Sequence, residues 1–235
     1  MSSSPSETST GALVWDLPVR IFHWSLAVLV PACWVTQEMG SRWMTLHMWL
    51  GYAVGALILF RLAWGFLGTR HARFGDFLAG PTRVFAYFRE WMSGRGPTAI
   101  GHDPAGGWWI VLLLALLAGQ VATGMLNSDG ALHAGPWHYA VPEDVADAAA
   151  AWHSDIFNLL ILAVTVHVAA VLAHLARPGI DLVTPMFTGR KPWANAGIPG
   201  SRTPRAMLIL VAAAAGIALL VWLAPAPDPA DFGIY

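Results

Sequence analysis

Two histidines in the second half of the chain, His153 and His167, have a spacing that suits a single helix. They lie 14 residues apart. At the 100° per residue of an α-helix, this spacing leaves them about 40° apart around the axis and roughly 21 Å apart along it. One helix face would therefore present two imidazoles at two depths, and imidazole is a common ligand for iron, copper and zinc.

The helix that carries these histidines belongs to an unusually apolar chain. Of its 235 residues, 56% are hydrophobic and 11% are charged, whereas soluble domains carry about 25% charged residues. Thirteen tryptophans and a mean hydropathy of +0.54 also indicate a lipid environment. The net charge of −1 argues against a nucleic-acid partner. We therefore predict an all-α integral membrane protein.

Five segments are apolar and long enough, or nearly so, to span a membrane, which takes about 20 residues. They are Val19 to Val35, Leu46 to Leu67, Trp108 to Leu126, Trp152 to Ala176 and Ala206 to Ala224. Pro31 is expected to kink the first segment. Between the second and third segments, an amphipathic pattern over Pro81 to Met92 predicts a short helix that lies in the membrane interface.

Arginine and lysine are concentrated in two of the connections between these segments. The basic residues are Arg70, Arg73, Arg83, Arg89 and Arg95 in one connection, and Arg177, Arg190, Lys191, Arg202 and Arg205 in the other. The loop from Asn127 to Ala151 and the tail after Pro225 contain neither residue type. Because cytoplasmic loops are enriched in Lys and Arg, we predict a multi-pass protein of the bacterial inner membrane with a cytoplasmic N-terminus and a periplasmic C-terminus.

Two further histidines, His23 and His47, complete two levels of imidazoles. In this topology His47 and His153 lie toward the outer face (the outer pair), and His23 and His167 lie toward the cytoplasm (the inner pair). Two imidazoles that face each other from different helices can ligate a six-coordinate b-type haem, and the core of a helix bundle is where such cofactors bind. The alternatives are ordinary interfacial histidines, or copper or zinc sites with only two ligands at each level.

Other polar residues could contribute to the inner site. His174 follows His167 by seven residues and could replace it as the ligand, but its depth matches that of His23 less well. We therefore expect His174 to make a polar contact at the interface. Arg20 and Arg61 are placed to pair with a haem propionate through a charge-assisted contact.

The remaining polar groups have less specific expectations. Gln120 and Thr123, inside the third segment, are expected to hydrogen-bond between helices or to contact a cofactor. The loop histidines, which we expect to be solvated or interfacial, are His71, His102, His133 and His138. The single cysteine, Cys33, excludes an internal disulfide and covalent haem attachment through a Cys-x-x-Cys-His motif. It is expected to be a small buried residue.

Several stretches together carry a family pattern. They are DLPVRIFHW (Asp16 to Trp24), LHMWLGY (Leu46 to Tyr52) followed by Arg61, GHDPAGGWW leading into GQVATG, HSDIFNLLILAVTVH (His153 to His167) and DLVTPMFTGRK (Asp181 to Lys191). From roughly Val14 to Lys191 the chain resembles the bacterial cytochrome b561 family, and it looks closest to the branch that contains the b-type cytochrome subunit of nickel–iron hydrogenases.

The resemblance implies a four-helix core that holds two non-covalent b haems. The ligands that it implies are His23, His47, His153 and His167, with none from the third helix, which contains no histidine. Family members exchange electrons between a membrane quinone and a redox partner protein. We accordingly expect three parts: residues 1–13 as a disordered tail, residues 14–191 as the di-haem domain, and residues 192–235 as a linker, a fifth membrane helix and a short outer tail.

Three functions are compatible with these features. The first is a membrane electron-transfer subunit that serves a cytochrome c or a dehydrogenase-type or hydrogenase-type subunit. The second is a self-contained oxidoreductase that moves electrons between superoxide and quinone. The third is a non-redox anchor or transporter. We favour the first, because no soluble catalytic domain is evident and because helix interiors lack the carboxylates that coupled carriers use.

Overall fold

The protein is described here from a computed structural model that covers residues 12–93, 103–130, 132–176, 181–191 and 203–225. Its helices are α1 (Leu17–Glu38), α2 (Met44–Leu67), α3 (Phe74–Phe77), α4 (Pro81–Met92), α5 (Pro104–Leu126), α6 (Glu143–Leu175), α7 (Thr184–Thr188) and α8 (Thr203–Trp222), with short 3₁₀ turns at Ser41–Trp43, Arg70–Ala72 and His138–Ala140. Five helices, α1, α2, α5, α6 and α8, are long and apolar enough to cross a membrane. The predicted all-α membrane bundle and its five spans are therefore confirmed.

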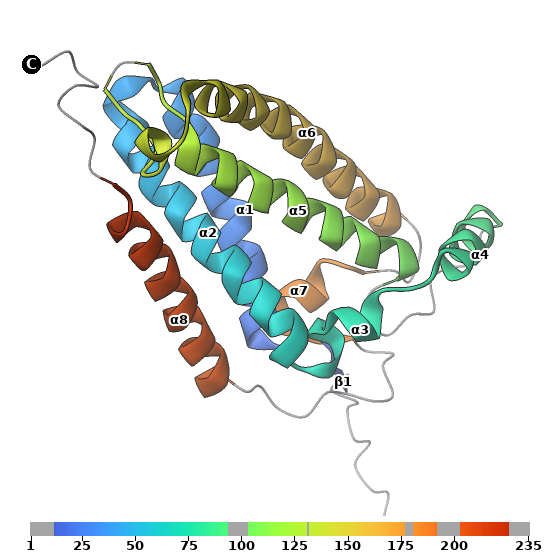
Figure 1. The fold of residues 1–235 in the computed structure, drawn as a ribbon. Helices are drawn as coiled ribbons and strands as arrows, with labels where there is room; N and C mark the ends of the chain where they lie inside the picture. The colour runs from blue at the N-terminus through green and yellow to red at the C-terminus, as the bar shows by residue number, and fades with distance from the viewer. Residues whose placement is uncertain (1–11, 94–102, 131, 177–180, 192–202, 226–235) are drawn as a thin grey trace, which may run out of the picture.

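Helix α2 has three neighbours among the five long helices, and α6 lies at the edge of the bundle. Helix α1 packs on α2, α2 packs on both α5 and α8, and α5 packs on α6 (Figure 1). Among the described elements, α6 packs closely only against α5. Directly packed helices lie about 8–10 Å apart, so α6 lies farther than this from α1 and α2. Side chains bridge the distance, as Trp34 of α1 and Phe157 of α6 do with ring centroids 5.8 Å apart.

Helix α2 lies at the centre of the hydrophobic core. Its buried side chains include Ile58, Phe60 and Trp64, which belong to a cluster shared with α1, α5, α6 and α8. Gly55 lets α8 approach closely, because a Cβ at this position would lie only 3.1 Å from a side-chain carbon of Ile217. The fifth helix therefore covers one face of α2.

The start of α1 is fixed by a buried carboxylate. Asp16 is 1% exposed, and its Oδ1 accepts a hydrogen bond from the Val19 backbone N–H at 2.8 Å, as an N-cap residue does. Its Oδ2 accepts from Trp64 Nε1 at 3.0 Å and from the Thr69 hydroxyl at 2.6 Å. One side chain therefore joins the first turn of α1 to the last turns of α2.

The segment after α6 closes on the same end of the bundle. Strand β2 (Arg190–Lys191) pairs antiparallel with β1 (Ala12–Leu13), and Gly189 has a φ of 79°, which favours glycine. The Trp24 indole donates to the Met186 carbonyl at 3.1 Å and stacks on Phe187 at 4.4 Å. Residues 1–11 of the expected N-terminal tail lie outside the described residues, and the last two residues of that tail form β1.

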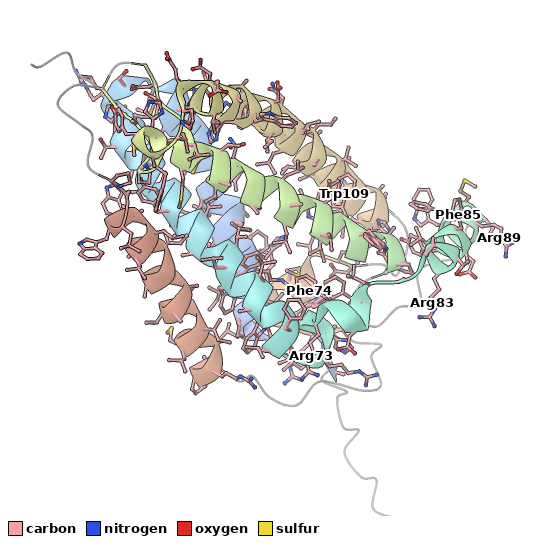
Figure 2. All side chains as sticks on the ribbon, in the orientation of Figure 1. Arg73, Phe74, Arg83, Phe85, Arg89 and Trp109 are labelled. Atoms are coloured by element: carbon pink, nitrogen blue, oxygen red, sulfur yellow. The ribbon has the colours of Figure 1, made fainter. Side chains whose placement is uncertain are left out.

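Helix α4 has the predicted bounds, and it stands away from the bundle at the end that carries α3 and α7 (Figure 1). Figure 2 shows Arg83, Phe85 and Arg89 projecting from it. Phe85 and Phe88 are exposed. A helix with exposed aromatic and basic side chains beside a membrane bundle suits the predicted place in the membrane interface.

Gly65 on α2 makes a close contact whose loss should destabilise the protein. A Cβ at Gly65 would collide with the ring of Phe74, which itself lies 5.2 Å from the Arg61 guanidinium. We expect Gly65→Ala to cost about 1–3 kcal/mol, the usual cost of overpacking, and to lower the thermal unfolding temperature in detergent. Gly216→Ala is the control, since a Cβ there meets nothing within 4 Å. Equal unfolding temperatures for the two variants would contradict the expectation.

Candidate haem site

The histidines of the outer pair face each other across the space between α2 and α6. The ring centroids of His47, on α2, and His153, on α6, lie 6.3 Å apart. In the inner pair, the centroids of His23, on α1, and His167, on α6, lie 6.4 Å apart. The structure thus brings together both pairs that the depth argument proposed, and each pair bridges the space where α6 does not pack on α1 or α2.

These separations match two imidazoles on opposite sides of one metal ion. A metal–imidazole bond is about 2.0–2.1 Å long, and bonds of ~1.33–1.4 Å in a five-membered ring put each nitrogen about 1.2 Å from the ring centroid. Two trans ligands would therefore have centroids about 6.4 Å apart. Within the described residues, no group of three or more His, Cys, Asp or Glu side chains could hold a metal ion. Two imidazoles at each level would suit an iron ion that takes its other ligands from a porphyrin ring.

The second ring nitrogens of the outer pair are held by neighbouring groups. His47 Nδ1 donates to the Cys33 carbonyl at 2.9 Å, and His153 Nδ1 donates to the Thr123 hydroxyl oxygen at 3.1 Å. This assignment leaves Nε2 of each ring with the lone pair that a metal ligand needs. In the structure, Gln120 Nε2 donates to His153 Nε2 at 3.1 Å, so the Gln120 amide has to turn aside when that nitrogen binds a metal.

The outer pair lies in a cavity of about 460 Å³. Apolar side chains from several helices line one part of it, including Val30, Val54, Leu117, Val121 and Leu160. Trp34 and Phe157, whose rings lie 5.8 Å apart, contribute to the wall between α1 and α6. Cys33 also lines this cavity and packs against the hydrophobic core, but it is half-buried rather than fully buried as expected.

The inner pair has a buried nitrogen without a partner. His23 Nδ1 is buried, and no group in the described part of the chain hydrogen-bonds to it. An orphaned buried imidazole nitrogen costs free energy unless a ligand or water satisfies it. His174, the alternative inner ligand, instead donates to the Ala170 carbonyl at 2.7 Å and lies 3.4 Å from the Tyr87 hydroxyl of α4. The geometry therefore places His167, and not His174, opposite His23.

The two arginines that we predicted for propionate binding differ in their surroundings. Arg61 is 2% exposed, and its guanidinium lies over the rings of Phe74 and Phe77 at 5.2 and 5.8 Å. Its Nη1 is buried, with no hydrogen-bond partner among the described residues. Arg20 Nη1 donates to the Phe187 carbonyl, which ties α1 to α7, while its Nε has no such partner.

The loop histidines that the structure describes are half-buried, which agrees with the expected solvated or interfacial positions. His138 Nδ1 donates to the Leu126 carbonyl at 3.0 Å. His71 is half-buried, and burial lowers its pKa, with a further contribution from Arg70. His102 lies outside the described residues. His133 lines the outer cavity and is held by Asp129; its place at the cavity depends on the path of the loop, which no sequence pattern indicated.

Membrane-spanning helices that present imidazoles in facing pairs are characteristic of membrane b-type cytochromes. A family model described as prokaryotic cytochrome b561 matches residues 14–189, and the chain belongs to this family. No curated protein and no solved structure matches the chain. Because the family consists of membrane cytochromes that bind haem b and transfer electrons, the chain is a multi-pass transmembrane cytochrome b of a bacterial membrane.

Proposed function

We propose that this cytochrome b carries two b haems, one ligated by His47 and His153 and the other by His23 and His167. We further propose that it passes electrons between the membrane quinone pool and a redox partner protein. The observation that carries this function is the pair of centroid separations, 6.3 and 6.4 Å, on the side where α6 is not packed against α1 or α2.

A bound haem would supply a one-electron carrier at each level. The contribution of the chain is to orient and enclose that carrier. The Cys33 carbonyl and the Thr123 hydroxyl fix the outer imidazole rings, and such partners also tune the ligand's basicity. Two histidines at each level would hold the haem iron, which would then serve electron transfer rather than the binding of oxygen.

We assign Arg61 to a propionate of the inner haem. Its support is the buried, unpartnered Nη1 on a side chain that is 2% exposed. A carboxylate would provide the charge-assisted partner that this guanidinium lacks. Arg20 has less support for the same role, because the Phe187 carbonyl already accepts from one of its nitrogens.

The proposed orientation places the arginine-rich connections in the cytoplasm and the Asn127–Ala151 loop in the periplasm. A cytochrome c or a dehydrogenase-type or hydrogenase-type subunit would be the redox partner. Residues 14–191 would form the haem domain, and α8 would support it by covering α2. Within the family, we propose that the chain belongs with the branch that contains the b-type cytochrome subunit of nickel–iron hydrogenases.

The deciding measurement is the haem content of the purified protein in detergent, together with its dithionite-reduced-minus-oxidised spectrum. We expect two non-covalent b haems per chain with low-spin, six-coordinate bands. A single haem would contradict the two-site proposal. No haem, after expression with an adequate haem supply, would overturn the cytochrome function itself and favour an anchor or transporter.

A further inference from the structure

The outer cavity has both apolar and polar lining residues. Its lining includes apolar side chains such as Val54, Leu117 and Leu160, and the polar residues Gln120, Ser154 and Asn158 of α5 and α6. What we call its polar mouth is the set of polar lining residues from the end of α1 and the loop after α5: Gln37, Glu38, Asn127, Ser128, Asp129 and His133. A b haem is amphiphilic, with an apolar ring and two carboxylates on one edge. Because burying an unpaired carboxylate is costly, the polar edge should lie at the polar mouth.

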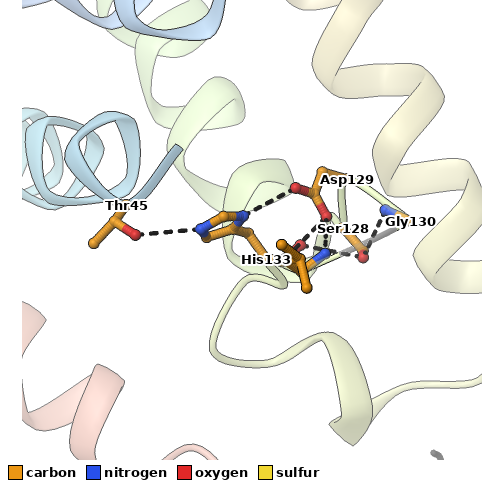
Figure 3. Close-up of polar contacts among 6 residues, drawn as sticks. Thr45, Ser128, Asp129, Gly130 and His133 are labelled. Atoms are coloured by element: carbon orange, nitrogen blue, oxygen red, sulfur yellow. Dashed lines mark hydrogen bonds and ion pairs between the residues drawn. The ribbon is translucent and has the colours of Figure 1, made fainter. Parts of the chain in front are cut away.

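His133 at this mouth is held in one orientation (Figure 3). Its Nδ1 donates to Asp129 Oδ2 at 3.0 Å, and Asp129 Oδ1 accepts from the backbone N–H groups of Leu132 and His133 at 3.0 and 2.9 Å. The other ring nitrogen, Nε2, lies 3.3 Å from the Thr45 hydroxyl, at the start of α2. The side chains of His133 and Asp129 are 21% and 14% exposed, so the pair is partly shielded from solvent.

The charges around the cavity make His133 distinctive. The titratable groups that line it are Cys33 and Glu38 from α1, His47 and Tyr52 from α2, Asp129 and His133 from the loop, and His153 from α6. In the described part of the chain, no Lys or Arg lines this cavity. Since His47 and His153 would be occupied as neutral ligands, His133 is the lining group that can offer a positive charge to a carboxylate.

We propose that His133, oriented by Asp129, is the counter-charge for a propionate of the outer haem, a role that rests on the proposed two-haem function. Its Nδ1–H is committed to Asp129, so Nε2 can donate to a second carboxylate only when the ring is protonated. The imidazolium then bridges two anions through two charge-assisted hydrogen bonds. Thr45, whose hydroxyl now contacts Nε2, would release that nitrogen to the propionate.

This contact has a redox consequence. A positive charge beside a haem favours the ferrous form, which carries one positive charge fewer than the ferric form. Removing the charge should leave two carboxylates near the iron and shift the balance toward the ferric state. We expect His133→Gln to change the ferric-to-ferrous ratio of the outer haem about tenfold at a given potential, a shift of ~59 mV to lower potential for a one-electron couple.

The test is a spectroelectrochemical titration of the intact, haem-loaded protein at one fixed pH. The outer wave is identified as the wave that His153→Ala removes. We expect His133→Gln to lower that wave and leave the inner wave in place, and His133→Lys, which restores a cation, to return it toward the wild-type value. The matched control is His138→Gln, in the same loop but absent from the lining of the cavity, which should leave both waves unchanged.

The other possible outcomes either support or overturn the proposed role of His133. An unchanged outer wave in His133→Gln would overturn the role of His133 while leaving the two-haem function intact. If the outer haem is lost from His133→Gln but kept in His133→Lys, the counter-charge is supported. Loss from both variants would assign His133 a structural role in the loop and overturn the proposal. A wild-type protein without two haems would overturn the proposed function, and this inference with it.

Discussion

The His153→Ala protein should bind one b haem per chain in place of two. His153 faces His47 with a centroid separation of 6.3 Å, and its removal leaves the outer site with one protein ligand. His167 of the inner pair lies 14 residues further along α6, roughly 21 Å away, and its partner His23 is on α1, so the inner haem should stay bound. The pyridine haemochrome assay gives the haem content, and a potentiometric titration should show a single wave.

His174→Ala is the matched control, because it removes a histidine from the same helix. His174 contacts the Ala170 carbonyl and Tyr87 rather than a facing imidazole, so both haems should remain. His23→Ala should give the complementary result and remove the inner haem alone. If His153→Ala kept both haems with unchanged spectra, the proposed outer pair would be wrong.

Asp16→Ala should be among the most destabilising single substitutions in the chain. The change removes the acceptor for three donors, the Val19 N–H, the Trp64 indole and the Thr69 hydroxyl. Leaving a buried donor without its acceptor costs about 1–3 kcal/mol, and the Trp64 indole and the Thr69 hydroxyl both lose theirs. We expect the unfolding temperature in detergent to fall by about 10 °C.

Asp103→Ala separates this network from ordinary helix capping. Asp103 is the N-cap of α5, and the Gly106 backbone N–H donates to its carboxylate at 2.7 Å, a capping contact equivalent to the one between Asp16 and Val19. Loss of such a cap costs about 1 kcal/mol, so this variant should lose only a few degrees. Comparable losses in the two variants would show that the contacts of Asp16 with Trp64 and Thr69 contribute little.

Apolar composition was enough to predict the five spans but not the ends of every helix. Helix α6 begins at Glu143, whereas the apolar run suggested Trp152. Its first turns contain acidic residues and alanines, which favour a helix through the helix dipole and through high helix propensity. Hydropathy detects the part of a helix that meets lipid, and it does not detect a helix that continues into water.

The pairing of the histidines could be predicted because helical geometry and the order of the membrane spans together determine the depth of each one. The pairing of β1 with β2 and the contacts of α7 could not be predicted. Two-residue strands have no periodicity, and this pairing joins segments that are far apart in the chain. The Asp16 network and the position of His133 were missed for a related reason. Each depends on how a loop returns to the bundle, and no local sequence pattern records that path.

The length of α6 has an energetic consequence for any charge that moves beside it. The helix has 33 residues, about 50 Å at 1.5 Å per residue, and a hydrocarbon core is about 30 Å thick. The roughly 21 Å between the levels of His153 and His167 is then about two thirds of the insulating layer. An electron that passes between the two levels does electrical work of about 1.6 kcal/mol per 100 mV. If the two proposed haems exchange electrons, the membrane voltage would oppose one direction of flow between them and assist the other.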